Sequence, residues 1–479
     1  MLRDVRHTVT DGLLGNATAT GDGKHVKIGV SPVTSITPIA ITGSMDAATI
    51  KLRLGLSPLA DAVMDSVQFG AGRIYCIPVA ASNQGTIGEV SQQGTGAGTL
   101  TATGNPTNAF SVAVKITAKG GLNVAAFAVS IDGGVNFGDD VTIPLNGKFD
   151  IAGTGVTLTF AGAAGEGSND NSFLIGDVYT FTTTAPTMTN SDVLDAMAKL
   201  KNFGEEVEFV HIVGGSNLAL WQAVSELKVE LRDVYHKPVF VMMEASRPTD
   251  GANLTDWALQ LEADRKKVKN YDFQVVPAWG RLVKLDGTTQ DVNLAGIAAG
   301  LYGSTAVHVS IGKTQQAAGL GISKTKLLEL LPVGMDDSII EILDVAGFLT
   351  FRGYDGLDDY YVYHAKMMCP DGSDYPYAED SRVRNKIIRE TRKEGLQYLN
   401  DDIDQTDISG ELNARAAFMA APLDRMIANK EISAAEVSVP EELVEKFKQD
   451  EIMRVLIRYV SRGYIREVVV DLGRKQADS

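Results

Sequence analysis

The C-terminal end of the chain constrains the fold most, because it contains two strand patterns with no covering element after them. The first pattern runs from Ile452 to Val460 and the second from Tyr464 to Leu472, and Ser461-Arg-Gly joins them. Met453, Val455, Ile457 and Tyr459 fall on one face of the first pattern and Arg454, Leu456 and Arg458 on the other, which is typical of a strand with one buried face. The predicted hairpin leaves one backbone edge unpaired, and such an edge can pair with another chain. The candidate edge for receiving a neighbour consists of Met453, Val455, Ile457 and Tyr459.

The composition limits the class of protein. Hydrophobic residues make up 44% of the 479 residues, enough for a sizeable core, so disorder is not expected. The formal charge of −16 argues against general nucleic-acid binding, which requires a basic surface. The two cysteines form no disulfide framework or metal pattern, and no signal peptide or membrane span is recognisable. We therefore expect a soluble protein made in a cytoplasm.

A low-charge segment interrupts the chain. Between Gln84 and Thr187 the sequence contains 18 Gly and 16 Thr but only 3 Lys or Arg. Short alternating runs lie between turn signals such as Asp132-Gly-Gly and Asn146-Gly, which is typical of hairpins. A strand pattern precedes the segment and a helix pattern follows it. The segment is therefore predicted to be a β-sandwich inserted at an exposed connection.

The flanking regions alternate strand and helix patterns. His25 to Val30, Arg73 to Val79 and Val207 to Val213 are predicted strands, whereas Ala47 to Val67 is predicted to be helical with a break near Pro58. Such alternation favours an α/β domain with a largely parallel sheet. The predicted class is therefore an α/β host domain with an inserted all-β sandwich and a C-terminal α+β domain with extended terminal arms. The expected boundaries are an N-terminal arm at 1–21, the host at 22–83 and 188–336, the insert at 84–187, and a C-terminal domain at 337–479 with an arm strand at 464–472.

Within the predicted C-terminal domain, Ser338 to Val345 and Phe348 to Arg352 are expected to be strands, and Arg382 to Leu399 a charged helix. The basic residues of this helix support two interpretations. It could be an exposed helix with pairs of opposite charge four residues apart, or a docking face for an acidic partner. The residues concerned are Arg382, Arg384, Lys386, Arg389, Arg392 and Lys393.

No motif in the chain predicts catalysis, cofactor binding or metal binding. Gly312-Lys-Thr lacks the earlier glycine of a phosphate loop, because Val307 occupies that position. The acidic run beginning at Asp401 lacks the glycine and the spacing of a calcium loop, so we expect a solvated loop that caps helices. His211 lies in an apolar strand pattern, where a satisfied sheet residue is more common than a base. We expect a protein that is not an enzyme and that has no cofactor.

An ordered series of segments resembles the shared domain of contractile tail sheath proteins, found in contractile-tailed phages and phage-tail-like bacteriocin particles. The segments are Phe348-Leu-Thr-Phe-Arg-Gly-Tyr, Tyr360-Tyr-Val-Tyr-His, Met367-Met-Cys-Pro-Asp-Gly, Arg382-Val-Arg-Asn-Lys-Ile and the ending from Val437 to Gly473. The resemblance implies sixfold rings stacked helically around an inner tail tube protein, with baseplate and tail terminator proteins at the ends. It also implies assembly in a bacterial host cytoplasm and contraction without nucleotide hydrolysis, driving the tube through a cell envelope. The resulting particle would be a virion tail or a released tail-like particle, with neither nucleic-acid binding nor membrane insertion by this subunit.

The same resemblance assigns roles to the two ends of the chain. Terminal arms of such proteins add strands to a sheet in neighbouring subunits, and the arm residues here would be Val5, His7, Val9, Ile465, Val468, Val470 and Leu472. The excess of positive charge further suggests that the basic helix meets the inner tube through Arg382, Lys386, Arg389, Arg392 and Lys393.

Two alternative functions remain open on the sequence. The chain could be an α/β enzyme with an appended carbohydrate-binding β module, which would need polar residues at the carboxyl ends of the host strands, near Gly214-Gly-Ser and Glu244. Helix-capping loops are the simpler interpretation of those residues. The chain could also be an adhesin or capsid-surface protein, because Gly/Thr-rich sandwiches are common in that class.

Overall fold

The computed structural model describes residues 22–163, 169–249 and 251–474. The chain divides into two compact units, Met1–Arg382 and Val383–Ser479. The first unit contains residues 337–382, which the sequence prediction grouped with the C-terminal domain.

A six-stranded sheet forms the centre of the first unit. Its order is β14-β13-β12-β1-β3-β2, and all neighbouring strands are parallel except β2 and β3. The strands are β1 (His25–Val30), β2 (Ile39–Thr42), β3 (Arg73–Val79), β12 (Phe209–Ser216), β13 (Phe240–Ala245) and β14 (Phe273–Val276). The predicted strands at 25–30 and 73–79 are confirmed, as is the largely parallel sheet.

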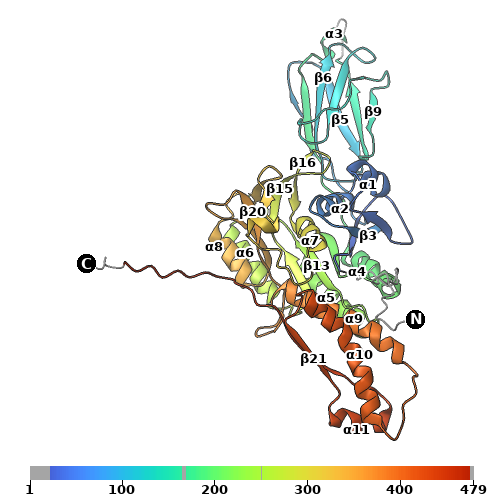
Figure 1. Ribbon diagram of the computed structural model, residues 1–479. Helices are drawn as coiled ribbons and strands as arrows, with labels where there is room; N and C mark the ends of the chain where they lie inside the picture. Colours follow the sequence, from blue (N-terminus) through green and yellow to red (C-terminus); the bar gives the residue numbers. More distant parts are fainter. Residues whose placement is uncertain (1–21, 164–168, 250, 475–479) are drawn as a thin grey trace, which may run out of the picture. The chain divides into compact units, whose positions relative to one another are not determined.

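Helices cover both faces of this sheet, as Figure 1 shows. Every residue of β1 is buried, so its two faces meet different cores: Val26 and Ile28 contact one helical layer, whereas His25 and Lys27 point to the other. The first layer consists of α4 (Asn190–Ala198), α5 (Leu218–Asp233), α6 (Leu254–Arg265) and α8 (Asp337–Val345), and the second of α1 (Ala47–Leu54), α2 (Pro58–Gln68) and α7 (Ala295–Ser304). A short 3-10 helix, η1 (Lys199–Asn202), follows α4.

Helix α7 packs closely on α2 because glycines face that helix. An added Cβ at Gly300 would lie 2.7 Å from the backbone oxygen of Ser66, and one at Gly296 would lie 2.9 Å from the Cβ of Asp65. The hydroxyl of Ser66 donates to the Gly296 carbonyl at 2.7 Å. The small residues of α7 therefore place α2 and its carboxylates directly beside the sheet.

Between β3 and α4 lie two further sheets that share an apolar core (Figure 1). One sheet has the order β4-β11-β6-β7-β8 and the other β5-β10-β9. The strands are β4 (Ser91–Gln93), β5 (Thr99–Gly104), β6 (Ser111–Ala118), β7 (Ala126–Ser130), β8 (Val141–Thr142), β9 (Lys148–Ile151), β10 (Val156–Ala161) and β11 (Val178–Thr182), with the short helix α3 (Asn169–Ser172) before β11. We call residues 84–187 the β-insert.

Two three-stranded sheets complete the first unit. The first is β16-β15-β18, made of β15 (Trp279–Val283), β16 (Thr289–Asn293) and β18 (Leu327–Leu331); the second is β17-β20-β19, made of β17 (Ile322–Ser323), β19 (Leu349–Gly353) and β20 (Asp359–Ala365). The 3-10 helix η2 (Gln316–Ala318) lies between β16 and β17 in sequence.

One predicted strand is a helix. Residues 338–345 belong to α8, whose first turn is capped by Asp336: the carboxylate accepts from the backbone N–H of Ile339 at 3.0 Å. Ile339, Ile340 and Leu343 are buried, at the spacing of one helix face. The β-branched residues suggested a strand, but the cap and the burial of this face favour the helix.

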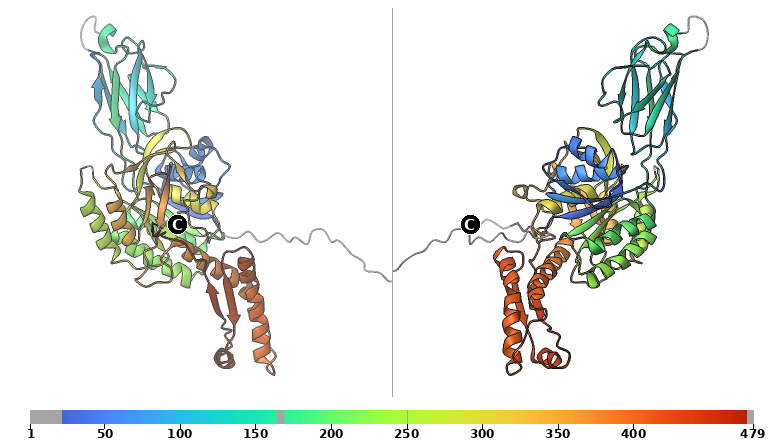
Figure 2. Two further views of the ribbon diagram at one scale, coloured as in Figure 1. Left: turned by 60° about the vertical axis from the view of Figure 1, so that its left-hand side comes forward. Right: turned by 90° about the vertical axis from the view of Figure 1, so that its right-hand side faces the viewer.

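Up to residue 474, where the described part of the chain ends, the second unit consists of helices and one pair of strands. Helix α9 (Ala378–Gly395) crosses the boundary between the units, and Figure 2 shows α10 beside the terminal strands. The remaining elements are η3 (Leu396–Tyr398), α10 (Ile408–Ala428), β21 (Ala434–Ser438), α11 (Glu441–Asp450) and β22 (Leu456–Val460). Asp407 caps α10 by accepting from the backbone N–H of Gly410 at 3.0 Å, so the acidic loop does cap a helix, as expected.

Candidate functional site

The predicted receiving edge lies in the two-stranded sheet of the second unit. Strand β22 pairs antiparallel with β21, with Ile457 opposite Val437 and Tyr459 opposite Ala435. Ile457 and Tyr459 are half-buried, whereas Leu456, Arg458 and Val460 are exposed. Met453 and Val455 precede the strand and pack against the apolar cluster beneath it, whose buried members come from α10, α11 and Val439. Because the sheet has only two strands in the described part of the unit, both are edge strands.

The predicted hairpin between the last two strand patterns does not form. Strand β22 pairs with β21 instead, and residues 464–472 have neither strand nor helix structure. Pairing with β21 places Val437 next to the cluster beneath α10, a contact that a terminal hairpin alone would not make. The four arm residues that the sequence placed here are highly exposed: Ile465 at 86%, Val468 at 76%, Val470 at 70% and Leu472 at 95%. Figure 1 shows this segment extending from β22 toward the C terminus.

The N-terminal arm residues Val5, His7 and Val9 lie outside the described residues. Their exchange between subunits stays a prediction.

The basic residues of α9 do not form the single exposed face that the sequence predicted. Arg382 is fully buried and forms an ion pair with Glu208, which is also fully buried. Lys386 is 7% exposed and contacts Glu431 at 2.8 Å, and Arg389 is 4% exposed. Buried side chains do not present charge to a partner at the surface of this chain, so the expected basic face is smaller than its sequence suggested.

Two of the five expected tube-facing residues lie nearer the surface. Arg392 is exposed, and Lys393 is partly exposed and pairs with Glu390 at 3.0 Å. An apolar groove lies beside them, lined by Ile388, Leu396, Leu399 and Met419 among others. Contact with an inner tube stays a prediction, and these two residues are its remaining charged candidates.

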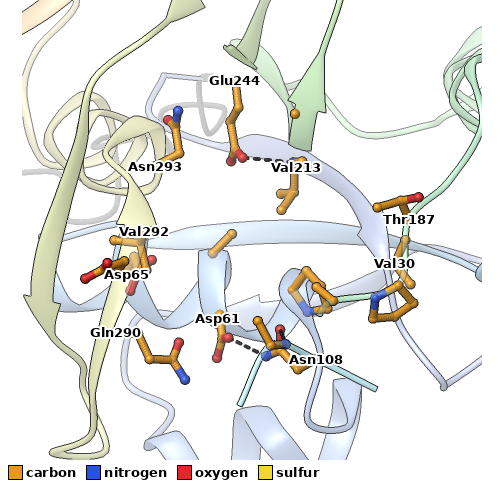
Figure 3. Close-up of a pocket in the computed structure, with 18 of the residues that line it drawn as sticks. Val30, Asp61, Asp65, Asn108, Thr187, Val213, Glu244, Gln290, Val292 and Asn293 are labelled. Atoms are coloured by element: carbon orange, nitrogen blue, oxygen red, sulfur yellow. Dashed lines mark hydrogen bonds between the residues drawn. The ribbon is translucent and has the colours of Figure 1, made fainter. Parts of the chain in front are cut away.

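A cavity of about 630 Å³ lies at the carboxyl ends of the parallel strands in the first unit. Val30 at the end of β1, Val213 in β12 and Glu244 in β13 line it, together with α2 and residues of the β-insert such as Asn108 (Figure 3). The residues near Gly214-Gly-Ser and Glu244 are those that the alternative enzyme function would need, although helix-capping loops were the simpler interpretation of them. The residues that the sequence reasoning missed are two acids of α2, the half-buried Asp61 and the buried Asp65.

Glu244, His211 and Lys27 form a buried series of polar contacts. Glu244 Oε1 lies 3.0 Å from His211 Nε2, and Glu244 Oε2 accepts from the Gly214 N–H at 2.9 Å. On the other side of the ring, Lys27 Nζ lies 2.5 Å from His211 Nδ1. His211 is fully buried with both nitrogens in contact, so it is a satisfied sheet residue, as expected. Burial raises the pKa of Glu244 to about 7 and lowers the pKa of Lys27 to about 7, because each charged form loses its hydration.

The opposite wall carries two further carboxylates from α2. Asp65 pairs with the buried Lys284, and burial raises the pKa of Asp65 to about 6 even though the ammonium opposes that shift. Asp61 accepts from Asn108 Nδ2 at 2.5 Å, and burial raises its pKa as well. The cavity thus has ionisable groups on two sides, each held by a protein partner.

No helix in the described part of the chain is long and apolar enough to cross a membrane. No group of three or more His, Cys, Asp or Glu residues within 22–163, 169–249 and 251–474 could hold a metal ion.

Several solved structures are similar to this chain over nearly its whole length. A chain from an extracellular contractile injection system, the PVC sheath complex in its contracted state, is 10% identical and superposes with a TM-score of 0.53, covering 99% of each chain. A chain from the anti-feeding prophage (AFP) baseplate in its contracted state is 12% identical, with a TM-score of 0.52 and 100% of both chains covered. A sheath tail protein from Desulfitobacterium hafniense is 14% identical, with a TM-score of 0.49 over 92% of this chain and 93% of its own.

The fold is therefore that of contractile injection system sheath chains, and the resemblance inferred from the sequence is confirmed at the level of the fold. The chain belongs to the DUF2586 family: the N-terminal domain of that family matches residues 2–365 and its C-terminal domain matches residues 374–479. No curated protein sequence matches the chain.

Proposed function

We propose that the chain is the structural subunit of a contractile sheath, rather than an enzyme. The observation that carries this proposal is the end-to-end match with a chain of the PVC sheath complex, which covers both units and not only a common α/β core. Subunits would stack as sixfold rings around an inner tube, with a baseplate at one end and a terminator at the other. Contraction of the sleeve would drive the tube through a cell envelope.

The C-terminal segment supports the way in which subunits would connect. Residues 464–472 combine high exposure with apolar side chains, and a two-stranded sheet in the same unit offers edges. A strand added to such an edge forms several backbone hydrogen bonds, each worth about 0.5–1.5 kcal/mol net. We infer that this segment pairs with β22 of a neighbouring subunit, and that the N-terminal arm takes part in the same sheet.

Truncation tests this connection. Ending the chain after Val460 removes the exposed segment but leaves β21, β22 and their apolar cluster intact. The truncated protein is expected to stay folded and to form no tubes under negative-stain microscopy, whereas the full chain forms tubes. A matched control that ends after Arg474 should assemble normally. Regular tubes from the chain ending at Val460 would refute strand exchange by this segment.

Removal of the β-insert tests whether the sleeve depends on it. The entry and exit of the insert are paired, since Asn83 N–H donates to the Thr187 carbonyl at 3.0 Å and the reciprocal bond is 2.9 Å. A short Gly-Ser link between these two residues therefore closes the gap without changing the sheet. We expect tubes from this variant, because we propose that the insert faces outward. Complete loss of assembly by a folded variant would show that the insert belongs to the lattice.

A further inference from the structure

The cavity of the first unit has the position of a ligand site in open α/β sheets. From β1 the chain continues to β3 on one side, while β12 pairs with β1 on the other, so the strand order reverses at β1. Ligands of such sheets bind outside the carboxyl ends of the strands at this reversal. The cavity lies there, and its volume of about 630 Å³ is in the range of small-molecule pockets. We propose that it binds an aliphatic amine with two or more ammonium groups.

The contacts of Glu244 determine the charge of the ligand. In related sheets, backbone N–H groups at the start of the helix after the strand hold an anion such as a phosphate. Here the Gly214 N–H, in β12 shortly before α5, donates to Glu244 Oε2 at 2.9 Å. The protein supplies its own anion at this point, and the carboxylate that occupies it faces the cavity (Figure 3). The crevice therefore suits a cation.

Hydrogen-bond capacity favours a ligand rich in donors. The side-chain amide of Asn108 donates to Asp61, that of Asn293 donates to the Val276 carbonyl at 2.9 Å, and Arg281 pairs with Asp291 at 2.9 Å. Each of these lining groups already has a protein acceptor. A carboxylate oxygen can accept more than one hydrogen bond, so the carboxylates retain acceptor capacity. An ammonium group provides three donors and no acceptor, which matches this lining.

The arrangement of the carboxylates favours more than one ammonium group. Figure 3 shows Glu244 on one side of the cavity and Asp61 with Asn108 on the opposite side. Val30, Pro58 and Val213 are among the apolar residues that line the space. An alkyl chain would pack against these apolar walls, and an ammonium at each end would meet one carboxylate.

Burial of the carboxylates supports the same ligand class. A carboxylate whose pKa is raised by burial lacks full compensation of its charge, and a bound ammonium would supply it. Binding should therefore be strongest where Glu244 and Asp65 are ionised, above about pH 7. Because Asn108 belongs to the β-insert while Asp61 and Glu244 belong to the central sheet and its helix, the amine would also bridge these two parts of the first unit.

Isothermal titration calorimetry of the full chain with putrescine and spermidine at pH 8 and 150 mM NaCl tests the proposal. We expect saturable binding of one amine per chain, with at least about tenfold weaker binding at pH 5.5. The neutral isostere 1,4-butanediol and inorganic phosphate should not bind. Asp61→Asn and Glu244→Gln lie on opposite walls, and each should weaken putrescine binding about tenfold, since each removes a carboxylate charge that would face an ammonium group. The matched control Asp139→Asn alters an exposed carboxylate of the β-insert and should bind as the parent chain does.

Circular dichroism of each variant shows whether it is folded, and either wall variant alone suffices for the test. Equal affinity in the parent, Asp61→Asn and Glu244→Gln would assign the amine to the acidic surface and overturn the proposal. Absence of saturable amine binding by the parent at millimolar concentration would overturn it as well, as would tighter binding of the diol or of phosphate. None of these results depends on tube formation, so the proposed sheath function is tested separately.

Discussion

Replacing Glu208 by Gln should destabilise the first unit strongly, because it leaves the Arg382 guanidinium buried without its ion-pair partner. Both side chains are fully buried, and Glu208 also accepts from the Gly23 N–H at 2.6 Å. Arg382 keeps neutral acceptors, among them the carbonyls of Tyr302 at 2.9 Å and Thr305 at 3.1 Å. Breaking a buried ion pair by removing one partner costs about 3–5 kcal/mol.

The size of this effect can be measured by fluorescence. All three tryptophans, Trp221, Trp257 and Trp279, lie in the first unit, so a thermal melt followed by tryptophan emission reports on that unit. At about 2.1 cal/mol/K per residue, unfolding of a unit this large has an entropy of roughly 0.8 kcal/mol/K, and the midpoint should fall by about 4–6 °C.

Two further variants complete the test of the buried pair. Glu226→Gln removes an exposed carboxylate of α5 and should leave the midpoint unchanged. The double variant Glu208→Gln with Arg382→Met should recover part of the loss, since no uncompensated charge remains. A midpoint within about 1 °C of the parent chain for Glu208→Gln alone would refute the reasoning.

Three other predictions concern the C-terminal segment, the basic helix and the cavity. Val468→Asp with Val470→Asp should abolish tubes in negative-stain images while the thermal midpoint stays unchanged, because both side chains are exposed within their own chain; tubes of normal yield would count against a role in assembly. Arg392→Glu should lower the yield of sheath on isolated inner tubes without affecting folding, whereas Arg389→Glu should impair folding itself because that residue is 4% exposed; equal behaviour of the two in a solubility assay would contradict this. Burial raises the pKa of Glu244 to about 7, so the native state binds this proton more tightly than the unfolded chain. The parent should therefore lose stability relative to Glu244→Gln as pH rises from about 4.5 to about 7, and identical pH profiles in urea denaturation would exclude the effect.

Secondary structure could be predicted where the hydrophobic pattern of a segment matched the burial of its residues in the fold. The strand at His25–Val30 is apolar at alternate positions, and its remaining residues were compatible with a buried sheet. The prediction of a strand at residues 338–345 was wrong because Ile339 and Ile340 have a high propensity for strands. The helix is indicated only by Leu343, which lies three to four residues further on and is buried on the same face. Short apolar segments are ambiguous in this way, because tertiary packing decides whether they form a strand or a helix.

The ion pairs of the first unit could not be predicted from the sequence. Arg382 belongs to a run of basic residues, which is normally an exposed face, and its partner Glu208 lies 174 residues earlier in the chain. The carboxylates of the cavity are similarly scattered, because Asp61 and Glu244 come from a helix and a strand far apart in sequence. Only the parallel order of the strands brings them to one end of the sheet, and no local pattern records that order.

The failure of the terminal hairpin strengthens the argument for assembly. Val468, Val469 and Val470 are consecutive, so a strand through them would place apolar side chains on both of its faces. Beside β22 such a strand would bury one face at most, because the alternating exposure of Leu456 to Val460 shows that the outer face of β22 is open to solvent. A single subunit thus has no element in its described second unit to cover both faces. Neighbouring copies could cover both, by supplying the sheet edge and a packing surface together, and this is why the exposed segment favours a polymer over an isolated subunit.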